Sequence, residues 1–313
     1  MKKFIMGLLL SLTVFSCNQI PDIDDATMLD GKIIFDSTLL KPEKYLISAF
    51  IPHPTDEQLN MPVIIAAHGY TATTFEWDEL RTYSNIKGTF YVSQVLLGGH
   101  GRSYEDFKNA TWEDWQLSIK DEYKKLSDMG FKKIYLAGSS TGAPLIINLL
   151  KTDFFSTLTK PKGLFLIDPI VVSSNKTLTM VGLLGPLLGY TTVELASGET
   201  GKWYVYRPQE TLKQLMTLIN ITRLDLQKGI SLPDNLYVKV YKSAIDDVAD
   251  PVSALLIYKG LKYDWTLYKN IDVELVDSKL HVFTRLAGRD EVTAADVALQ
   301  KRVFIEMESK MLQ

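Results

Sequence analysis

The chain has 313 residues, a length that suits one α/β domain with an insertion. Apolar residues make up 46% of the sequence, which is enough for one large buried core. The 34 basic and 37 acidic residues give a net charge of −3 and are spread along the chain. No basic stretch of the kind that binds nucleic acid is present, so we expect no nucleic-acid partner.

The beginning of the sequence predicts an export signal. Lys2 and Lys3 precede an apolar run over residues 4–15, which is too short to cross a bilayer as a helix, and Cys17 follows. Residues 12–17 resemble the lipobox of bacterial lipoproteins. That resemblance implies a signal peptide over residues 1–17 and lipid attachment at Cys17, the one cysteine of the chain. The protein would then be an exported, membrane-anchored lipoprotein facing the periplasm or the cell surface, and a soluble secreted protein is the alternative.

Strand-like and helix-like runs alternate from residue 31 onward. This alternation favours the α/β class, with a mostly parallel central sheet flanked by helices. Some runs, such as Val63–Ala67, are apolar throughout, as expected of strands buried on both faces. We expect the first two strands to be antiparallel neighbours at one edge. In chain order the strand candidates cover residues 32–36, 45–51, 63–67, 89–95, 133–137, 163–167, 236–241 and 271–276.

Helix candidates lie between these strands. Residues 112–129 carry apolar side chains at helical spacing and end at Gly130, a residue typical of helix C-caps. Residues 251–261 begin with proline at a first helical position, and residues 292–311 close the chain.

The interval between residues 168 and 236 breaks the alternation. Residues 181–188 are apolar and residues 209–226 look like an amphipathic helix, but no clear strand occurs. A long insertion here is typical of a helical cap over an active site. We therefore expect a polar tether over residues 18–30, a core over residues 31–170 and 235–313, and a cap insertion over residues 171–234.

The sequence Gly138-Ser139-Ser140-Thr141-Gly142 has the form G-x-S-x-G. A predicted strand runs into it and a predicted helix leaves it, with Pro144 in the first turn, where a missing N–H does no harm. Such a sharp turn needs small residues beside the nucleophile, and it sets the serine near the positive end of a helix. The motif predicts Ser140 as a nucleophile.

A serine nucleophile needs a base that is held by an acid, and in this type of fold the order is serine, acid, histidine. Of the four histidines only His281 lies downstream of Ser140, so it is the expected base. The acid should follow the strand over residues 236–241. Asp246 stands in a D-x-V-x-x-P pattern and is our choice over Asp247, while Asp250 is typical of a helix N-cap.

Acyl transfer also needs hydrogen-bond donors for the oxyanion that forms on the carbonyl. One expected donor is the backbone N–H after the nucleophile, that of Thr141, and the other comes from the loop after an early strand. His68-Gly69-Tyr70 ends such a strand, so the N–H of Tyr70 is the second candidate. We interpret His68 as a structural residue that braces this loop.

Four motifs carry a resemblance to a known family. The chain resembles bacterial carboxylesterases, and it is similar to monoacylglycerol lipases and the related serine aminopeptidase-like hydrolases, from about residue 62 to His281. The resemblance implies an α/β-hydrolase fold, a Ser140–Asp246–His281 triad and oxyanion donors at Tyr70 and Thr141. The motifs are His68-Gly69-Tyr70-Thr71, Gly99-His100-Gly101-Arg102-Ser103, Trp112-Glu113-Asp114-Trp115 and Gly138-Ser139-Ser140-Thr141-Gly142.

These observations predict a serine hydrolase that cleaves small carboxylic esters with short to medium acyl chains. Two alternatives remain: an aminopeptidase-like amide hydrolase, with Glu194 or Glu199 holding the substrate amine, and a ligand-binding lipoprotein without turnover. No Cys/His cluster and no Gly-rich phosphate loop occurs in the sequence, so we expect no metal and no cofactor.

Overall fold

The computed structural model describes residues 23–36, 41–174, 189–263 and 270–313. The predicted signal peptide, the predicted lipid-attachment residue Cys17 and the apolar run over residues 181–188 lie outside these ranges. Among the helices within them, none has both the length and the apolar character that a membrane span requires.

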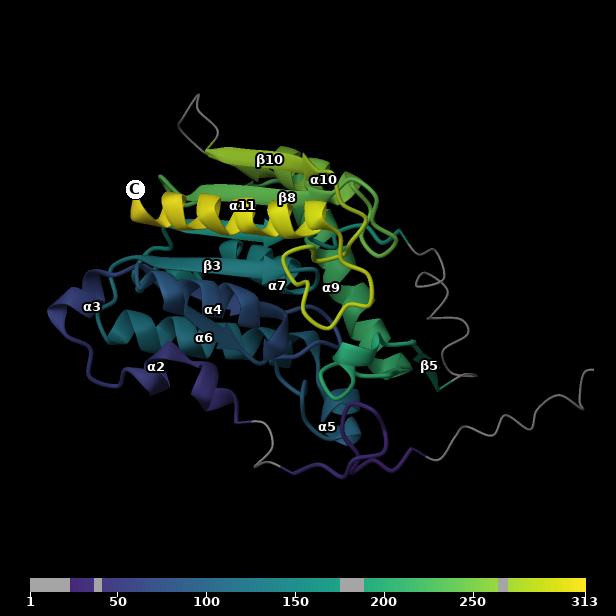
Figure 1. Cartoon of the computed structure of the whole chain (residues 1–313). Helices are drawn as coiled ribbons and strands as arrows, with labels where there is room; N and C mark the ends of the chain where they lie inside the picture. The colour runs from purple at the N-terminus through teal and green to yellow at the C-terminus, as the bar shows by residue number, and fades with distance from the viewer. Residues whose placement is uncertain (1–22, 37–40, 175–188, 264–269) are drawn as a thin grey trace, which may run out of the picture.

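A six-stranded sheet forms the centre of the protein, in the order β10-β8-β4-β3-β1-β2, and every neighbouring pair is parallel (Figure 1). The expectation of a mostly parallel sheet flanked by helices is confirmed. The strands are β1 (Val63–Ala67), β2 (Tyr91–Val95), β3 (Ile134–Ser139), β4 (Gly163–Ile167), β8 (Tyr237–Ser243) and β10 (Ile271–Val276).

Helices cover both faces of this sheet. Helices α4 (Asp78–Lys87) and α11 (Ala294–Leu312) pack on one face, and α6 (Trp112–Asp128), α7 (Gly142–Leu150) and α10 (Val252–Gly260) pack on the other. Shorter helices complete the core: η1 (Pro42–Tyr45), α2 (Ile47–Phe50), α3 (Asp56–Asn60), η2 (Thr74–Trp77), α5 (Tyr104–Asn109) and η3 (Asp153–Phe155).

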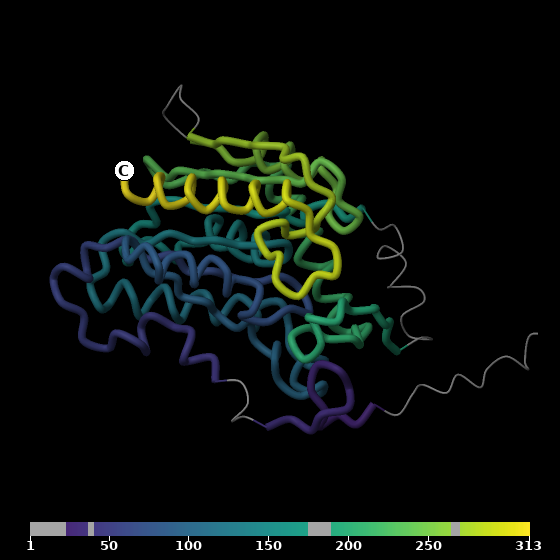
Figure 2. Tube along the Cα trace, in the orientation of Figure 1, coloured from purple at the N-terminus to yellow at the C-terminus, as the bar shows by residue number. Residues whose placement is uncertain are grey.

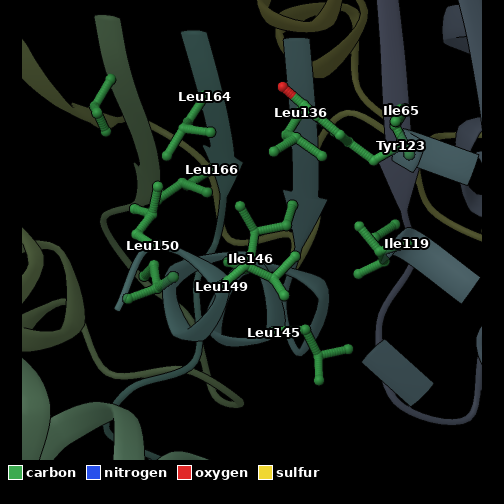
Figure 3. Close-up of a cluster of buried hydrophobic side chains, with 14 of the residues drawn as sticks. Ile65, Ile119, Tyr123, Leu136, Leu145, Ile146, Leu149, Leu150, Leu164 and Leu166 are labelled. Carbon is green, nitrogen blue, oxygen red and sulfur yellow. The ribbon is translucent and has the colours of Figure 1, made fainter. Parts of the chain in front are cut away.

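The larger hydrophobic core lies between the sheet and α7. Figure 3 shows leucine and isoleucine side chains of α7 pointing at those of β3 and β4, with α6 beside them. Each fully buried side chain of this kind contributes about 1.5–3 kcal/mol. The labelled members of this cluster are Ile65, Ile119, Tyr123, Leu136, Leu145, Ile146, Leu149, Leu150, Leu164 and Leu166.

The interval expected to form a cap holds a hairpin and a long helix. Strands β5 (Tyr190–Thr192) and β6 (Tyr206–Pro208) pair antiparallel, with η5 (Ser197–Glu199) between them, and α9 (Gln209–Lys228) follows. Strands β7 (Ile230–Ser231) and β9 (Leu261–Lys262) form a separate parallel pair. Helix α9 corresponds to the amphipathic helix predicted over residues 209–226.

The two strands predicted before β1 are wrong. Within residues 32–36 only Ile34 forms a bridge, to Thr27, and residues 42–50 form η1 and α2. Ile47 and Ile51 are both buried and lie four residues apart, so their spacing fits one face of a helix as well as it fits alternate positions of a strand. The short segment did not contain enough turns to distinguish the two periods.

The start of the described chain packs on α5 and on the interval expected to form the cap. The N–H of Val205 donates to the carbonyl oxygen of Leu29 at 2.8 Å, and the N–H of Tyr104 donates to that of Thr27 at 2.6 Å. Figure 2 shows this purple segment beside the cap and α5. Met28 and Leu29 are buried, so residues 23–30 of the expected tether are attached to the folded protein.

Candidate active site

Ser140 lies in a sharp turn between β3 and α7, and its φ is 47°. This left-handed conformation costs a non-glycine residue about 1–2 kcal/mol. Both flanking glycines are required by close approach of the chain. A Cβ at Gly142 would lie 2.3 Å from the carbonyl oxygen of Ala67, and one at Gly138 would lie 2.6 Å from the carbonyl carbon of Gly142. The turn predicted from the motif is therefore present.

His281 and Asp246 meet beside this turn. The Nδ1 atom of His281 is 2.8 Å from Oδ2 of Asp246, and the side chain of Asp246 is fully buried. Asp247, the rival acid, is exposed. Because Nδ1 faces the carboxylate, Nε2 is the ring nitrogen able to accept a proton from a nucleophile.

Asp246 is fixed from several directions. Its Oδ1 atom accepts hydrogen bonds from the N–H groups of Val248 at 2.8 Å and Ala249 at 3.1 Å. Burial acts to raise the pKa of Asp246, but hydrogen bonds and positive charge from His281 and Lys242 outweigh burial and hold the pKa well below its ordinary value. Asp246 therefore carries a negative charge across the whole physiological pH range.

The two expected oxyanion donors lie at one small cavity. Within the described ranges, the backbone N–H groups of Tyr70 and Thr141 have no hydrogen-bond acceptor. The cavity has a volume of about 150 Å³, and Ser140 and His281 also line it. Its wall is mixed, with apolar and charged side chains: Ile170, Trp203, Arg207, Leu212, Leu215, Val248 and Arg285.

Solved structures with lipolytic functions share this architecture. The first, from work on the metagenome-derived lipolytic enzymes LipS and LipT, aligns over 80% of this chain and 94% of its own, with 17% identity and a TM-score of 0.62. The monoacylglycerol lipase of Paleococcus ferrophilus aligns over 80% and 96%, with 14% identity and a TM-score of 0.60. The chain has the α/β-hydrolase fold.

A relative by sequence agrees with that fold. The chain is similar to the thermostable monoacylglycerol lipase of Bacillus sp. (strain H-257), with 26% identity over 204 residues, which are 64% of this chain and 78% of the relative. No protein-family profile matches the chain. The predicted resemblance to monoacylglycerol lipases is thus confirmed.

A buried charge network lies beside His281 and Asp246, and no sequence motif predicts it. Asp168 directly follows β4, has φ of 45° and is fully buried. The ammonium of Lys242 on β8, also fully buried, lies 3.1 Å from Asp168 and 2.6 Å from Asp246. Asp168 further accepts the N–H groups of Ser243 at 2.6 Å and Val282 at 2.8 Å, so it fixes the backbone next to His281.

The carboxylates of this network share a positive charge from Lys242. Single ligand atoms of Asp168, Asp246 and His281 lie within 4.8 Å of one another, a spacing that a cation could bridge. The ammonium of Lys242 already contacts both carboxylates and supplies the positive charge there.

Glu76 is a second residue that sequence reasoning missed. It is buried under the nucleophile turn, where its Oε1 atom accepts the N–H of Gly69 at 2.8 Å and the hydroxyl of Ser139. Glu76 thereby ties the loop that carries Tyr70 to the turn that carries Ser140. Its only sequence signal is an acidic residue within the aromatic run Phe75-Glu76-Trp77.

His68 and His100 are structural in this geometry. The Nδ1 atom of His68 lies 2.8 Å from the carbonyl oxygen of Gly69, and its Nε2 atom accepts the N–H of Leu97 at 3.1 Å. Burial, opposed by the hydrogen bond to Gly69, lowers the pKa of His68 to about 4. Burial also lowers the pKa of His100, whose ring centroid is 5.1 Å from that of His68. Both rings are therefore neutral at pH 7 and support the loop that carries Tyr70.

Proposed function

We propose that the protein is a serine ester hydrolase that cleaves carboxylic esters of short to medium acyl chain. Ser140 is the nucleophile, His281 the base and Asp246 the acid. The observation that carries this proposal is the 2.8 Å contact between His281 and Asp246. His281 lines a cavity with Ser140, Tyr70 and Thr141, and the N–H groups of Tyr70 and Thr141 have no acceptor among the described residues.

The reaction follows from these positions. His281 removes the proton of Ser140 as the hydroxyl oxygen attacks the ester carbonyl, and the N–H groups of Tyr70 and Thr141 stabilise the oxyanion. Asp246 stabilises the imidazolium that forms. His281 then gives the proton to the leaving alcohol, and water releases the acid from Ser140 by the same steps.

The cavity supports a small acyl group. Its volume of about 150 Å³ is below the roughly 300–1,000 Å³ of most ligand pockets. The apolar side chains of Ile170, Leu212 and Leu215 would contact the acyl chain. The relatives are lipolytic enzymes by name, which supports esters as the substrate class.

The amide alternative loses one of its two candidate carboxylates, while Glu194 is exposed. Glu199 was a candidate to hold a substrate amine, but its carboxylate pairs with Arg285 at 2.6 Å. Because the Arg285 guanidinium already neutralises the Glu199 carboxylate, this carboxylate is not free to bind a substrate amine.

The test is the rate of hydrolysis of p-nitrophenyl esters from acetate to laurate, with Ser140→Ala in parallel. We expect the rate of hydrolysis to be highest for esters with short acyl chains and to fall by at least about 10³-fold in Ser140→Ala. Equal rates in both proteins, or no hydrolysis of any ester, would contradict it.

We also propose that the protein is exported and anchored to a membrane through lipid at Cys17. Residues 18–22 would then separate the anchor from the described chain, a reach of about 17 Å when extended. Because Thr27 and Leu29 are hydrogen-bonded to Tyr104 and Val205, the anchor would hold this side of the protein near the bilayer, where lipid esters occur. Cys17→Ser should move the protein from the membrane fraction to the soluble fraction, and an unchanged distribution would count against the anchor.

A further inference from the structure

Arg207 on β6 places a positive charge at the cavity that Ser140 lines, and this charge has no counter-charge among the described residues. Its side chain lines the same cavity as Ser140 and His281, and it pairs across the hairpin with Thr191. The Nε atom is shielded from solvent and has no hydrogen-bond partner. No other described residue forms an ion pair or a hydrogen bond with its guanidinium.

Arg207 is partly buried, and a cation that loses part of its hydration without a counter-charge is unfavourable in a folded protein. Buried charges are normally paired and hydrogen-bonded, because loss of hydration is otherwise not offset. The effect of the environment on Arg207 is evident, since burial lowers its pKa and only the Tyr70 phenol opposes this. A guanidinium stays protonated in proteins even so, and it therefore needs an anion.

The other charged groups of the cavity are already satisfied. Arg285 pairs with Glu199 at 2.6 Å and lies over the ring of Trp203. Glu76 accepts hydrogen bonds from Gly69 and Ser139. Arg207 is thus the lining charge whose partner is missing among the described residues.

We propose that Arg207 binds an anionic group of the substrate, a carboxylate or a phosphate carried by the ester that Ser140 attacks. The planar guanidinium binds either oxyanion through two parallel hydrogen bonds, which neither an ester carbonyl nor an alkyl chain can accept. This inference rests on the proposed ester hydrolase and names its substrate class. Arg207 and Ser140 line one cavity of about 150 Å³, so the anion and the scissile bond would lie in the same cavity.

The experiment compares matched neutral and anionic esters. Ethyl butyrate is paired with monoethyl succinate, which places a carboxylate on the acyl side, and 1-butyrylglycerol is paired with its 3-phosphate, which places a phosphate on the alcohol side. Release of acid is measured for the native protein and for Arg207→Gln. Arg223→Gln, which removes a positive charge from α9 outside the cavity, is the matched control.

The native protein should prefer one anionic ester over its neutral partner by about 10- to 100-fold in kcat/KM, the effect expected of a charged hydrogen-bonded pair. A preference for monoethyl succinate over ethyl butyrate would identify a carboxylate as the bound anion. A preference for the 3-phosphate over 1-butyrylglycerol would identify a phosphate. Arg207→Gln should lose the preference while its rate on the neutral esters stays within about threefold. Its melting temperature should hold or rise, because no buried carboxylate loses a partner.

Three results would overturn the inference, and they differ in what they leave intact. Hydrolysis of the neutral esters without preference for either anionic ester, or an equal loss on all four esters in Arg207→Gln, contradicts the anion site and leaves the ester hydrolase intact. Hydrolysis of none of the four esters by the native protein contradicts the proposed function and this inference together.

Discussion

Ser140 combines backbone strain with a position in the sharp turn between β3 and α7. Its φ of 47° lifts the side chain out of the sheet, and the glycines at 138 and 142 let the chain fold back without a steric clash. A residue in a strained conformation persists only where its surroundings determine it. Here Glu76 supplies part of that constraint, because it accepts hydrogen bonds from the N–H of Gly69 and from the hydroxyl of Ser139, the residue before Ser140.

The sequence predicts the candidate site residues that stand in a motif or at a typical position in the fold. It does not predict the buried residues that hold them in place. Ser140 is marked by the glycines around it, and His281 by its position after the last strand. Glu76, Asp168 and Lys242 act through contacts between segments distant in the chain. Lys242 and Asp168 are 74 residues apart, so no local pattern could join them.

At the residue scale, Asp246 is distinguished from Asp247 by its contact with His281. We expect Asp246→Asn to lower kcat for a p-nitrophenyl ester by about 10³- to 10⁴-fold, because an amide can no longer hold the imidazole in its productive tautomer. Asp247→Asn, on an exposed side chain, should stay within about twofold. A larger loss of kcat in Asp247→Asn than in Asp246→Asn would show that Asp247, and not Asp246, is the acid.

At the element scale, the ends of parallel strands bring the site together. β3, β4, β8 and β10 lie side by side, and the residues that follow them include Ser140, Asp168, Asp246 and His281. The alternation of strands and helices in the sequence predicts this arrangement, since parallel strands present their carboxyl ends at one edge. The short segments before β1 were not predictable in the same way, because their few apolar residues fit two periods.

Lys242 links β8 to β4 and to the acid. We expect Lys242→Met to lower the free energy of unfolding by about 3–5 kcal/mol, since two buried carboxylates would lose their cation. The double variant with Asp168→Asn should lose less than the sum of the single variants, because the unpaired charge is removed. Urea unfolding of the four proteins measures this coupling. Losses that add within about 0.5 kcal/mol would show that the pair does not interact.

At the scale of the whole molecule, the fold buries two neutral histidines, His68 and His100. The unfolded chain binds protons on these rings near pH 6.5, whereas folded His68 does so only near pH 4. The unfolded state therefore binds more protons between these values, and stability falls as the pH falls. His100 contributes with the same sign.

We expect His68 to account for roughly 3 kcal/mol of the stability lost between pH 6.5 and pH 4. Urea unfolding at both pH values should show a smaller loss in His68→Asn than in the native protein. His53 is exposed, so His53→Asn should leave the loss unchanged. The same pH dependence in all three proteins would contradict the assignment of a neutral buried ring.

Labelling with a fluorophosphonate tests the central claim, that Ser140 is the nucleophile activated by His281. The reagent forms a stable bond to an activated serine, and peptide mass spectrometry locates the adduct. We predict a single adduct on Ser140, complete loss of esterase activity with it, and labelling slowed by at least about 10³-fold in His281→Ala. An adduct on another residue, or hydrolysis that continues when Ser140 is fully labelled, would contradict the account.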